Sequence, residues 1–216
     1  MGKFGQQKYK ELSRDHFEEL SSHYSDACAG KYTEPMHYDI IQELAGRNFE
    51  RLLDVGCGTG TFLSMVSNKF HARVSGIDIS PGMIERSREL LGHRVDLRVG
   101  DSEHLPWEDK SFDIITCIAS FHHYPSPELV LREMRRVLRS GGHLIIADPW
   151  APNPFRFLVN LVLRSRFNSA GDVRVYTQDE MEELLKDCGF TSAKWMIKGN
   201  LLRRYFIVTA SPGQRS

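Results

Sequence analysis

Leu52-Leu53-Asp54-Val55-Gly56-Cys57-Gly58-Thr59-Gly60-Thr61 is the stretch that decides the fold. Its apolar first half is typical of a buried parallel strand. Its glycines permit a tight turn and a close approach of the backbone to a ligand. The amphipathic segment from Phe62 to Phe70 is a helix pattern, and the free N–H groups that begin a helix favour a negative ligand group. The stretch therefore predicts a strand, a glycine loop and a helix around a nucleotide-like cofactor.

The spacing of the glycines narrows the kind of cofactor. Gly56, Gly58 and Gly60 give the pattern G-x-G-x-G. The dinucleotide fingerprint G-x-G-x-x-G needs a glycine at the position that Thr61 occupies. A phosphate-binding P-loop needs a Lys and a Ser or Thr after its last glycine, and no Lys follows here. The loop therefore differs from both of these phosphate-binding patterns.

The segment from Leu53 to Gly60 closely resembles motif I of the class I S-adenosylmethionine (SAM) dependent methyltransferases. The wider chain is similar to their type 11 members, such as the C-methyltransferases of ubiquinone and menaquinone biosynthesis. The resemblance implies an α/β fold: a Rossmann-like, mostly parallel seven-stranded sheet in the order 3-2-1-4-5-7-6, with strand 7 antiparallel and helices on both faces. It also implies transfer of a methyl group from SAM to a small-molecule acceptor, with S-adenosylhomocysteine as product.

Length and composition limit the number of domains and the kinds of partner that the protein can have. The 216 residues suit one domain, with a helical cover over 1–46, a cofactor-binding core over 47–150, and a lid with closing strands over 151–210. Acidic and basic residues balance at 28 each, so no nucleic-acid partner is expected. No signal segment or membrane-spanning run is seen, and scattered cysteines indicate reduced thiols. A cytoplasmic protein is the expectation, and the oligomeric state is left open.

Asp78 stands where a ribose-binding carboxylate is expected. It ends the predicted strand that runs up to Ile77, and it lies 22 positions after Gly56, near the spacing of ribose-binding acids in nucleotide folds. A carboxylate can accept from both ribose hydroxyls. Ser80 and Pro81 are typical of an N-cap and a first helical residue, which predicts a helix from there to about residue 91.

The segment 100–107 resembles the family's G-D-A-x-x-L-P-F motif. The resemblance implies that Asp101 accepts a hydrogen bond from the adenine amine, and that the backbone N–H of Ser102 faces an adenine ring nitrogen. Ile79 and Leu105 would pack on the two faces of the ring. Ordinary core packing explains these two apolar residues almost as well.

A histidine pair follows the predicted fourth strand, Phe112 to Cys117. The loop after this strand is expected to face the glycine loop, because ligands bind where the strand order reverses. Cys117 and Ile118 should line the methionine end of the cofactor. His122 and His123 are the catalytic candidates, since imidazole exchanges protons near neutral pH, although they could simply hold the loop. No metal site is expected, because the other histidines lack ligand spacing relative to this pair.

The candidate site divides into a cofactor part and an acceptor part. Tyr24 and Tyr32, near the join of two predicted helices at 9–24 and 35–44, and Trp150, beyond the fifth strand, should line the acceptor pocket. The apolar stretch 152–167 suggests a lid over an apolar or aromatic acceptor, but a dimer contact or a plain cover of the sheet explains it equally. The residues expected to bind SAM are Asp54, Gly56, Cys57, Gly58, Gly60, Asp78, Ile79, Asp101, Ser102, Cys117 and Ile118.

The remaining elements follow from local signals. A helix over 129–138 should end at Gly141-Gly142, and a strand should begin at residue 143. Thr177 and Glu180 have the spacing of a capping box, which predicts a helix to residue 187. Two closing strands, 195–197 and 205–210, are expected to form an antiparallel hairpin.

Two other functions are compatible with parts of the sequence. A nicotinamide-dependent oxidoreductase would use a similar sheet, but the glycine spacing and the Asp101 segment count against it. A SAM-binding partner subunit without activity would keep the cofactor residues and transfer no methyl group. The sequence leaves open the acceptor, the atom that is methylated and the use of a general base.

Overall fold

The computed structural model describes residues 3–24, 28–92, 95–163, 168, 170–200 and 203–213. Its sheet has the strand order β3-β2-β1-β4-β5-β7-β6, which confirms the predicted topology. Strands β1 to β5 pair in parallel, and β7 is antiparallel to both of its neighbours. The strands are β1 Arg51–Val55, β2 Arg73–Asp78, β3 Asp96–Val99, β4 Phe112–Ile118, β5 Leu138–Pro149, β6 Phe190–Asn200 and β7 Arg203–Pro212.

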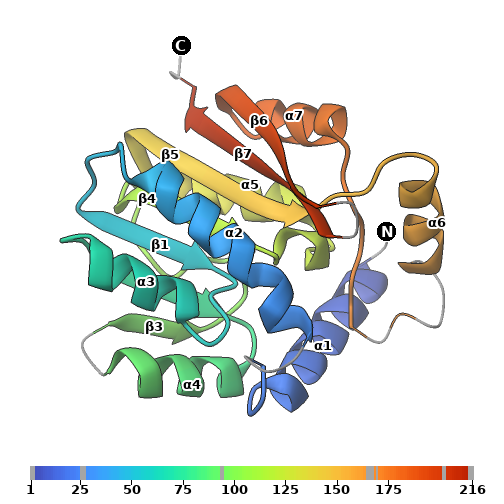
Figure 1. The fold of residues 1–216 in the computed structure, drawn as a ribbon, viewed down its shortest axis with the longest axis horizontal. Helices are drawn as coiled ribbons and strands as arrows, with labels where there is room; N and C mark the ends of the chain where they lie inside the picture. Colours follow the sequence, from blue (N-terminus) through green and yellow to red (C-terminus); the bar gives the residue numbers. More distant parts are fainter. Residues whose placement is uncertain are drawn as a thin grey trace.

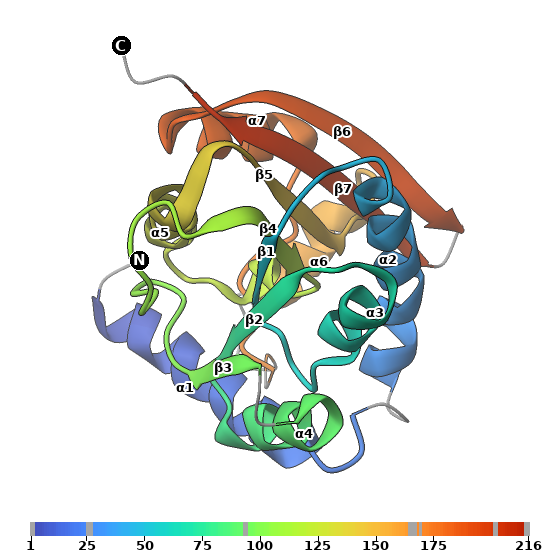
Figure 2. The same ribbon diagram turned by 90° about the vertical axis from the view of Figure 1, so that its left-hand side faces the viewer.

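Helices cover both faces of this sheet (Figures 1 and 2). Alternate strand residues such as Leu52 and Leu53 point to opposite faces, and each belongs to a separate buried cluster. The cluster around Leu52 includes side chains of α2, α3 and α4, and the cluster around Leu53 includes α5 and α7. The helices are α1 Lys3–Leu20, α2 Cys28–Leu44, α3 Thr61–Lys69, α4 Pro81–Leu91, α5 Pro127–Val137, α6 Phe155–Leu163 and α7 Gln178–Asp187, with a short 3-10 helix, η1, at Phe121–His123.

The strand ends bring the predicted site residues to one edge. In register, Val55 of β1 pairs with Ile77 of β2, and Asp54 pairs with Thr116 of β4. The loops that follow these three strands therefore meet at the carboxyl edge of the sheet. Helices α1 and α6 lie at this same end, on the right-hand side of Figure 1.

Two local predictions were wrong, and packing explains both. Helix α2 contains Pro35 in its interior instead of starting there, because its buried face, which includes Met36 and Ile40, stabilises the helix more than one missing hydrogen bond weakens it. Gly141 and Gly142 lie inside β5 instead of ending α5. A Cβ on Gly142 would stand 2.6 Å from the carbonyl oxygen of Asp113, so the glycine lets β5 pass close to β4.

Other boundaries agree with the prediction or shift modestly. Ser80 and the Thr177–Glu180 pair cap their helices as expected, and β6 and β7 form the predicted hairpin but are longer. Helix α6 buries none of its side chains, so it is not a plain cover of the sheet. Arg164, Arg166 and Phe167 of the predicted lid lie outside the described residues. None of the described helices is both long and apolar enough to cross a membrane.

Gly76→Ala is expected to destabilise the fold by about 1–3 kcal/mol, as overpacking of a core does. Gly76 lies in β2, and a Cβ there would stand 2.7 Å from the Sγ of Cys57 and 2.9 Å from Leu63. Urea unfolding measures the loss as a lower midpoint. Gly46→Ala is the matched control, because its Cβ would meet nothing within 4 Å. Equal midpoints for the two variants would contradict the tight packing of the glycine loop on β2.

Candidate active site

The glycine loop is fixed by backbone contacts to β2. The N–H groups of Gly56 and Cys57 both donate to the carbonyl oxygen of Ile77, at 2.8 and 3.0 Å. Gly58 has φ +52°, and a Cβ built on it would meet no atom within 4 Å. Positive φ favours glycine, and the open space leaves the loop backbone accessible to a ligand.

Asp78 connects the glycine loop to the start of α4. Its Oδ2 accepts from the N–H of Gly58 at 2.9 Å, and its Oδ1 accepts from the N–H of Ser80 at 3.0 Å. Burial raises the pKa of this carboxyl group. Each carboxylate oxygen has a second lone pair, so Asp78 can hold the loop and still accept from a ligand.

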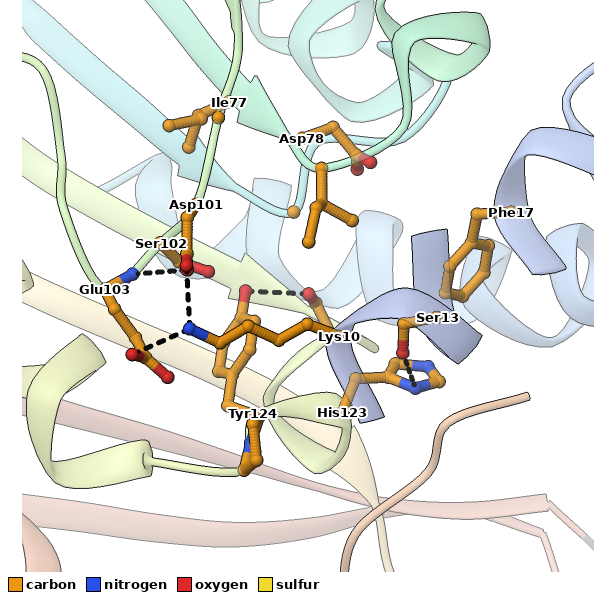
Figure 3. A pocket seen from close by; sticks show the side chains of 15 residues that line it. Lys10, Ser13, Phe17, Ile77, Asp78, Asp101, Ser102, Glu103, His123 and Tyr124 are labelled. Atoms are coloured by element: carbon orange, nitrogen blue, oxygen red, sulfur yellow. Dashed lines mark hydrogen bonds and ion pairs between the residues drawn. The ribbon is translucent and has the colours of Figure 1, made fainter. Parts of the chain in front are cut away.

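A cavity at the carboxyl ends of β2 and β3 contains most of the predicted ribose and adenine residues (Figure 3). Asp78, Ile79, Asp101 and Ser102 line it, together with Gly56 of the glycine loop. Helix α1, η1 and the residues beside them complete the wall with Lys10, Ser13, Phe17, Ser120, His123, Tyr124 and Pro125. By contrast, Leu105 is 4% exposed and packs in the hydrophobic core.

Helix α1 supplies charged groups that sequence reasoning missed. The Nζ of Lys10 lies 2.7 Å from Asp101 Oδ2 and 2.7 Å from Glu103 Oε2. Burial opposes the charge on Lys10, but the hydrogen bonds to the two carboxylates raise its pKa. Glu18 accepts from the hydroxyl of Ser80 at 2.7 Å. Lys10 therefore forms an ion pair with Asp101, the carboxylate that is expected from the resemblance to bind adenine.

A second cavity continues from Gly56 along the glycine loop and under α2. Asp54, Cys57, Gly58 and Ile118 line it. Asp54 accepts from the hydroxyl of Thr116 at 2.7 Å, and burial raises the pKa of Asp54 to about 7. The two cavities therefore both reach Gly56: Asp101 and Asp78 line the first, and Asp54 lines the second.

Two predicted cofactor residues lie behind this lining. Gly60 has φ +78°, and a Cβ there would stand 2.2 Å from the hydroxyl oxygen of Ser87 in α4. A glycine is therefore needed at position 60 so that α3 can pack against α4. Cys117 is fully buried in the core, and its Sγ lies 3.8 Å from the hydroxyl of Tyr124.

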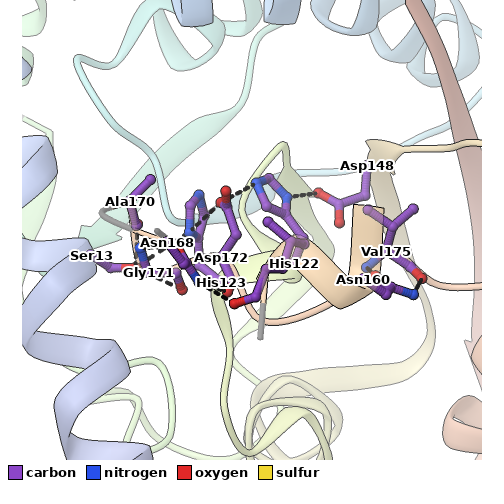
Figure 4. A network of polar contacts seen from close by, with 11 residues as sticks. Ser13, His122, His123, Asp148, Asn160, Asn168, Ala170, Gly171, Asp172 and Val175 are labelled. Atoms are coloured by element: carbon purple, nitrogen blue, oxygen red, sulfur yellow. Dashed lines mark hydrogen bonds and ion pairs between the residues drawn. The ribbon is translucent and has the colours of Figure 1, made fainter. Parts of the chain in front are cut away.

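The histidine pair belongs to a chain of polar contacts (Figure 4). His122 Nδ1 lies 2.9 Å from Asp148 Oδ1, and His122 Nε2 lies 3.4 Å from Asp172 Oδ1. His123 Nδ1 lies 3.2 Å from the same oxygen of Asp172 and 3.3 Å from the hydroxyl of Ser13. Asp172 therefore bridges the two imidazoles.

The two histidines differ in charge. Burial opposes a proton on His122, but the charges and hydrogen bonds of Asp148 and Asp172 raise its pKa to about 10. Burial and the neighbouring charge of His122 lower the pKa of His123 to about 3. At neutral pH the pair therefore carries one positive charge, on His122, and His123 is neutral.

Asp172 adds a third possible metal ligand to the histidine pair. Sequence reasoning compared histidine spacings alone. Within the described part of the chain, His122, His123 and Asp172 form a group whose ligand atoms lie within 4.8 Å of one another and could hold a metal ion. The existing ion pairs and hydrogen bonds use these same atoms.

The three predicted acceptor residues do not gather at one place. Tyr24 lines the second cavity, beside the glycine loop, and burial raises its pKa to about 12. Tyr32 donates its hydroxyl to the carbonyl oxygen of Arg204 at 2.7 Å, and the guanidinium of Arg204 lies 5.7 Å from the ring of Trp150. Tyr32 and Trp150 thus meet at the start of β7.

A glycine loop and carboxylates at successive strand ends are features of an α/β enzyme that binds a nucleotide-like cofactor. Residues 53–146 match the family model of the methyltransferase domain. The chain is 30% identical over 171 residues to demethylmenaquinone methyltransferase of Thermotoga maritima, a match that covers 70% of this chain and 74% of that protein. The chain belongs to the class I SAM-dependent methyltransferases.

Two further comparisons agree with this assignment. Methyltransferase GfsG of Streptomyces halstedii is 40% identical over 127 residues, which cover 56% of this chain and 45% of that protein. A solved structure of a SAM-dependent methyltransferase from Thermotoga maritima has a TM-score of 0.72 at 20% identity, and the match covers 92% of this chain and 99% of that one. This structural likeness concerns the fold alone.

Proposed function

We propose that this chain binds SAM across the two cavities that meet at Gly56 and transfers the methyl group to a small-molecule acceptor. The observation that carries the proposal is the alignment of three carboxylates with the glycine loop. The adenine would lie at Asp101, the ribose at Asp78, and the methionine part along Gly56 to Gly58. Binding of adenine at Asp101 requires the ion pair between Lys10 and Asp101 to break.

The chemistry of the lining residues fits such a ligand. Carboxylates accept hydrogen bonds from the ribose hydroxyls and the adenine amine, and Asp54 can pair with the amino group of the methionine part. The open space beside Gly58 admits a ligand close to the backbone. Each hydrogen bond to a charged group contributes about 1.5–3 kcal/mol.

Bound SAM supplies an activated methyl group with its own leaving group. The protein's task is then to position the acceptor and to exclude water, and positioning can contribute roughly 7–11 kcal/mol to lowering the barrier. His123 lines the cavity in its neutral form, so it can orient an acceptor through a hydrogen bond, while its lowered pKa makes it a weak base. His122 has carboxylates at both ring nitrogens and is a positioning residue.

The acceptor is proposed to be small and of low polarity. Tyr32 and Trp150 present aromatic surface near the carboxyl end of β5, and the name of the Thermotoga relative, demethylmenaquinone methyltransferase, is in keeping with such an acceptor. A panel of hydroquinones, phenols and amines, with product analysis by mass spectrometry, tests this assignment.

Ligand-induced stabilisation tests the cofactor assignment. SAM or S-adenosylhomocysteine at 100 times its dissociation constant should add about 2.7 kcal/mol of stability, seen as a higher melting temperature. Stabilisation by NAD in place of SAM would overturn the proposal in favour of an oxidoreductase. Tight SAM binding without transfer to any acceptor of the panel would indicate a partner subunit without activity.

SAM affinity is expected to rise with pH as Asp54 ionises. The pKa of Asp54 in the free protein is raised to about 7, and only its carboxylate form can pair with the ammonium group of SAM. Below pH 7 the affinity should therefore fall, by up to about tenfold per pH unit. Isothermal titration calorimetry between pH 5.5 and 8.5 measures this slope. Asp54→Asn should remove the slope, whereas a slope that persists in this variant would contradict the assignment.

His123→Ala is expected to slow methyl transfer to an accepted substrate by about tenfold, the effect of losing one hydrogen bond that orients the acceptor. SAM affinity should change little, because the cofactor contacts lie on other residues. The control is His104→Ala, an exposed histidine in the loop after β3. Equal rates for wild type and the His123 variant would show that the histidine only holds the loop.

A further inference from the structure

Helix α6 exposes apolar side chains to solvent and directs a polar side chain toward the protein, which is the reverse of an ordinary surface helix. Its large apolar side chains face solvent, with 65% of Phe155 and 67% of Phe157 exposed. Its amide residue faces the protein: the side chain of Asn160 accepts from the N–H of Val175 at 2.8 Å and donates to the carbonyl of Val175 at 3.1 Å. The exposed apolar residues of α6 are Phe155, Phe157, Leu158, Val159, Leu161 and Val162.

This exposed face needs an apolar partner. Contiguous exposed apolar patches on a folded protein mark sites of interaction. Asn160 fixes the orientation of α6, because it pairs with both polar groups of one backbone residue. The apolar face is therefore directed outward by a specific contact, at the end of the molecule where the strands finish (Figure 1).

The charges of the surrounding segment indicate what the partner is. Residues 149–171 contain three arginines and no Asp or Glu, in a chain whose total charge is balanced. Arg156 lies on α6 itself, and its guanidinium donates to the neutral side-chain amide of Asn153 at 3.0 Å. Arginine and large apolar residues together are typical of helices that lie in the headgroup region of a bilayer.

We propose that α6 binds the surface of an anionic lipid bilayer, with its apolar face at the boundary of the acyl chains. A second copy of this chain fits less well. A helix of nine residues is about 14 Å long and about 10 Å wide, so one face of it offers far less than the roughly 800 Å² per partner of a stable interface. An anionic surface is also complementary to the positive charge of this segment, whereas a second copy would carry the same charge. The proposal goes beyond methyl transfer and does not depend on it.

Vesicle flotation of the full chain tests this proposal. One set of vesicles contains phosphatidylcholine alone, and the other contains phosphatidylcholine with about 30% phosphatidylglycerol, an anionic lipid. We expect binding to the anionic vesicles that weakens with added salt. Leu158→Ser with Leu161→Ser should weaken this binding by about tenfold or more, since each leucine buried in the bilayer contributes to affinity.

The matched control replaces two exposed leucines elsewhere, Leu90→Ser with Leu129→Ser. Their side chains are 53% and 46% exposed, close to the 53% and 59% of Leu158 and Leu161, and this variant should bind like wild type. Equal binding by both variants, or no binding of wild type, would overturn the proposal. A dimer in sedimentation that the α6 variant dissociates, without vesicle binding, would assign the face to a second copy. Stabilisation by SAM, measured on the same variants, separates failure here from failure of the proposed function.

Discussion

Asp78→Ala is expected to weaken SAM binding by at least about 100-fold. The loss of two charge-assisted hydrogen bonds to the ribose, at about 1.5–3 kcal/mol each, accounts for this factor. The change also leaves the N–H groups of Gly58 and Ser80 without the carboxylate that accepts from them at 2.9 and 3.0 Å. Calorimetric titration with SAM and with S-adenosylhomocysteine measures the effect, and thermal melting verifies that the variant is folded.

A ligand analogue separates ribose binding from support of the loop. Wild type should discriminate strongly against an S-adenosylhomocysteine analogue that lacks both ribose hydroxyls, and the Asp78 variant should bind both ligands alike. Asp96→Ala is the matched control, because Asp96 lies on the neighbouring strand and pairs with Arg98 and Trp107. If the variant keeps the discrimination of wild type, Asp78 acts on the loop alone and the ribose assignment is wrong.

His122→Gln is expected to destabilise the protein by about 3–5 kcal/mol, the usual cost of removing one partner of a buried ion pair. Asp148, which is 1% exposed, and Asp172 would both lose their cation. Urea unfolding measures the loss. His71→Gln on the surface is the control and should be neutral. The double variant His122→Gln with Asp148→Asn should recover part of the stability, because it removes one buried negative charge.

The effect of His122 should depend on pH in a defined direction. Its pKa in the folded protein is raised from 6.5 to about 10, so its contribution to stability is fully present below pH 6.5 and is lost as pH rises through about 10. The pKa of Asp172 is lowered to about 2, so its contribution is lost only in acid. The difference in the free energy of unfolding between wild type and His122→Gln should therefore shrink toward zero as the pH approaches 10. A gap that is the same at pH 6 and pH 10 would contradict an imidazolium at His122.

Features with a local signal could be predicted from the sequence. The caps at Ser80 and Thr177 depend on residues within one helical turn, and the structure contains both. The glycine loop is similar, because three positive φ angles require glycine at fixed positions. The strand order came from the resemblance of these motifs to a family and not from periodicity.

Features that depend on distant contacts could not be predicted. Lys10 is an ordinary charged residue of a helix until it meets Asp101, 91 positions away. Nothing in the sequence around Asp172 indicates that it bridges the two histidines, and Asp148, 26 positions from His122, is the carboxylate that favours a charge on His122. The error at Pro35 has the same origin, because the side chains that keep α2 continuous are buried by residues far along the chain.

The contacts of α1 have a consequence for the order in which the chain is made. This helix is synthesised before its partners, which come much later in the chain: Lys10 contacts Asp101, Ser13 contacts His123, and the hydroxyl of Ser13 also lies 3.3 Å from the carbonyl oxygen of Ala170. Closing such long loops costs entropy that only the finished contacts return. Helix α1 can therefore make all of these contacts only after residue 170 has emerged, and the wall that it forms completes the cavity between α1, β2 and β3 late.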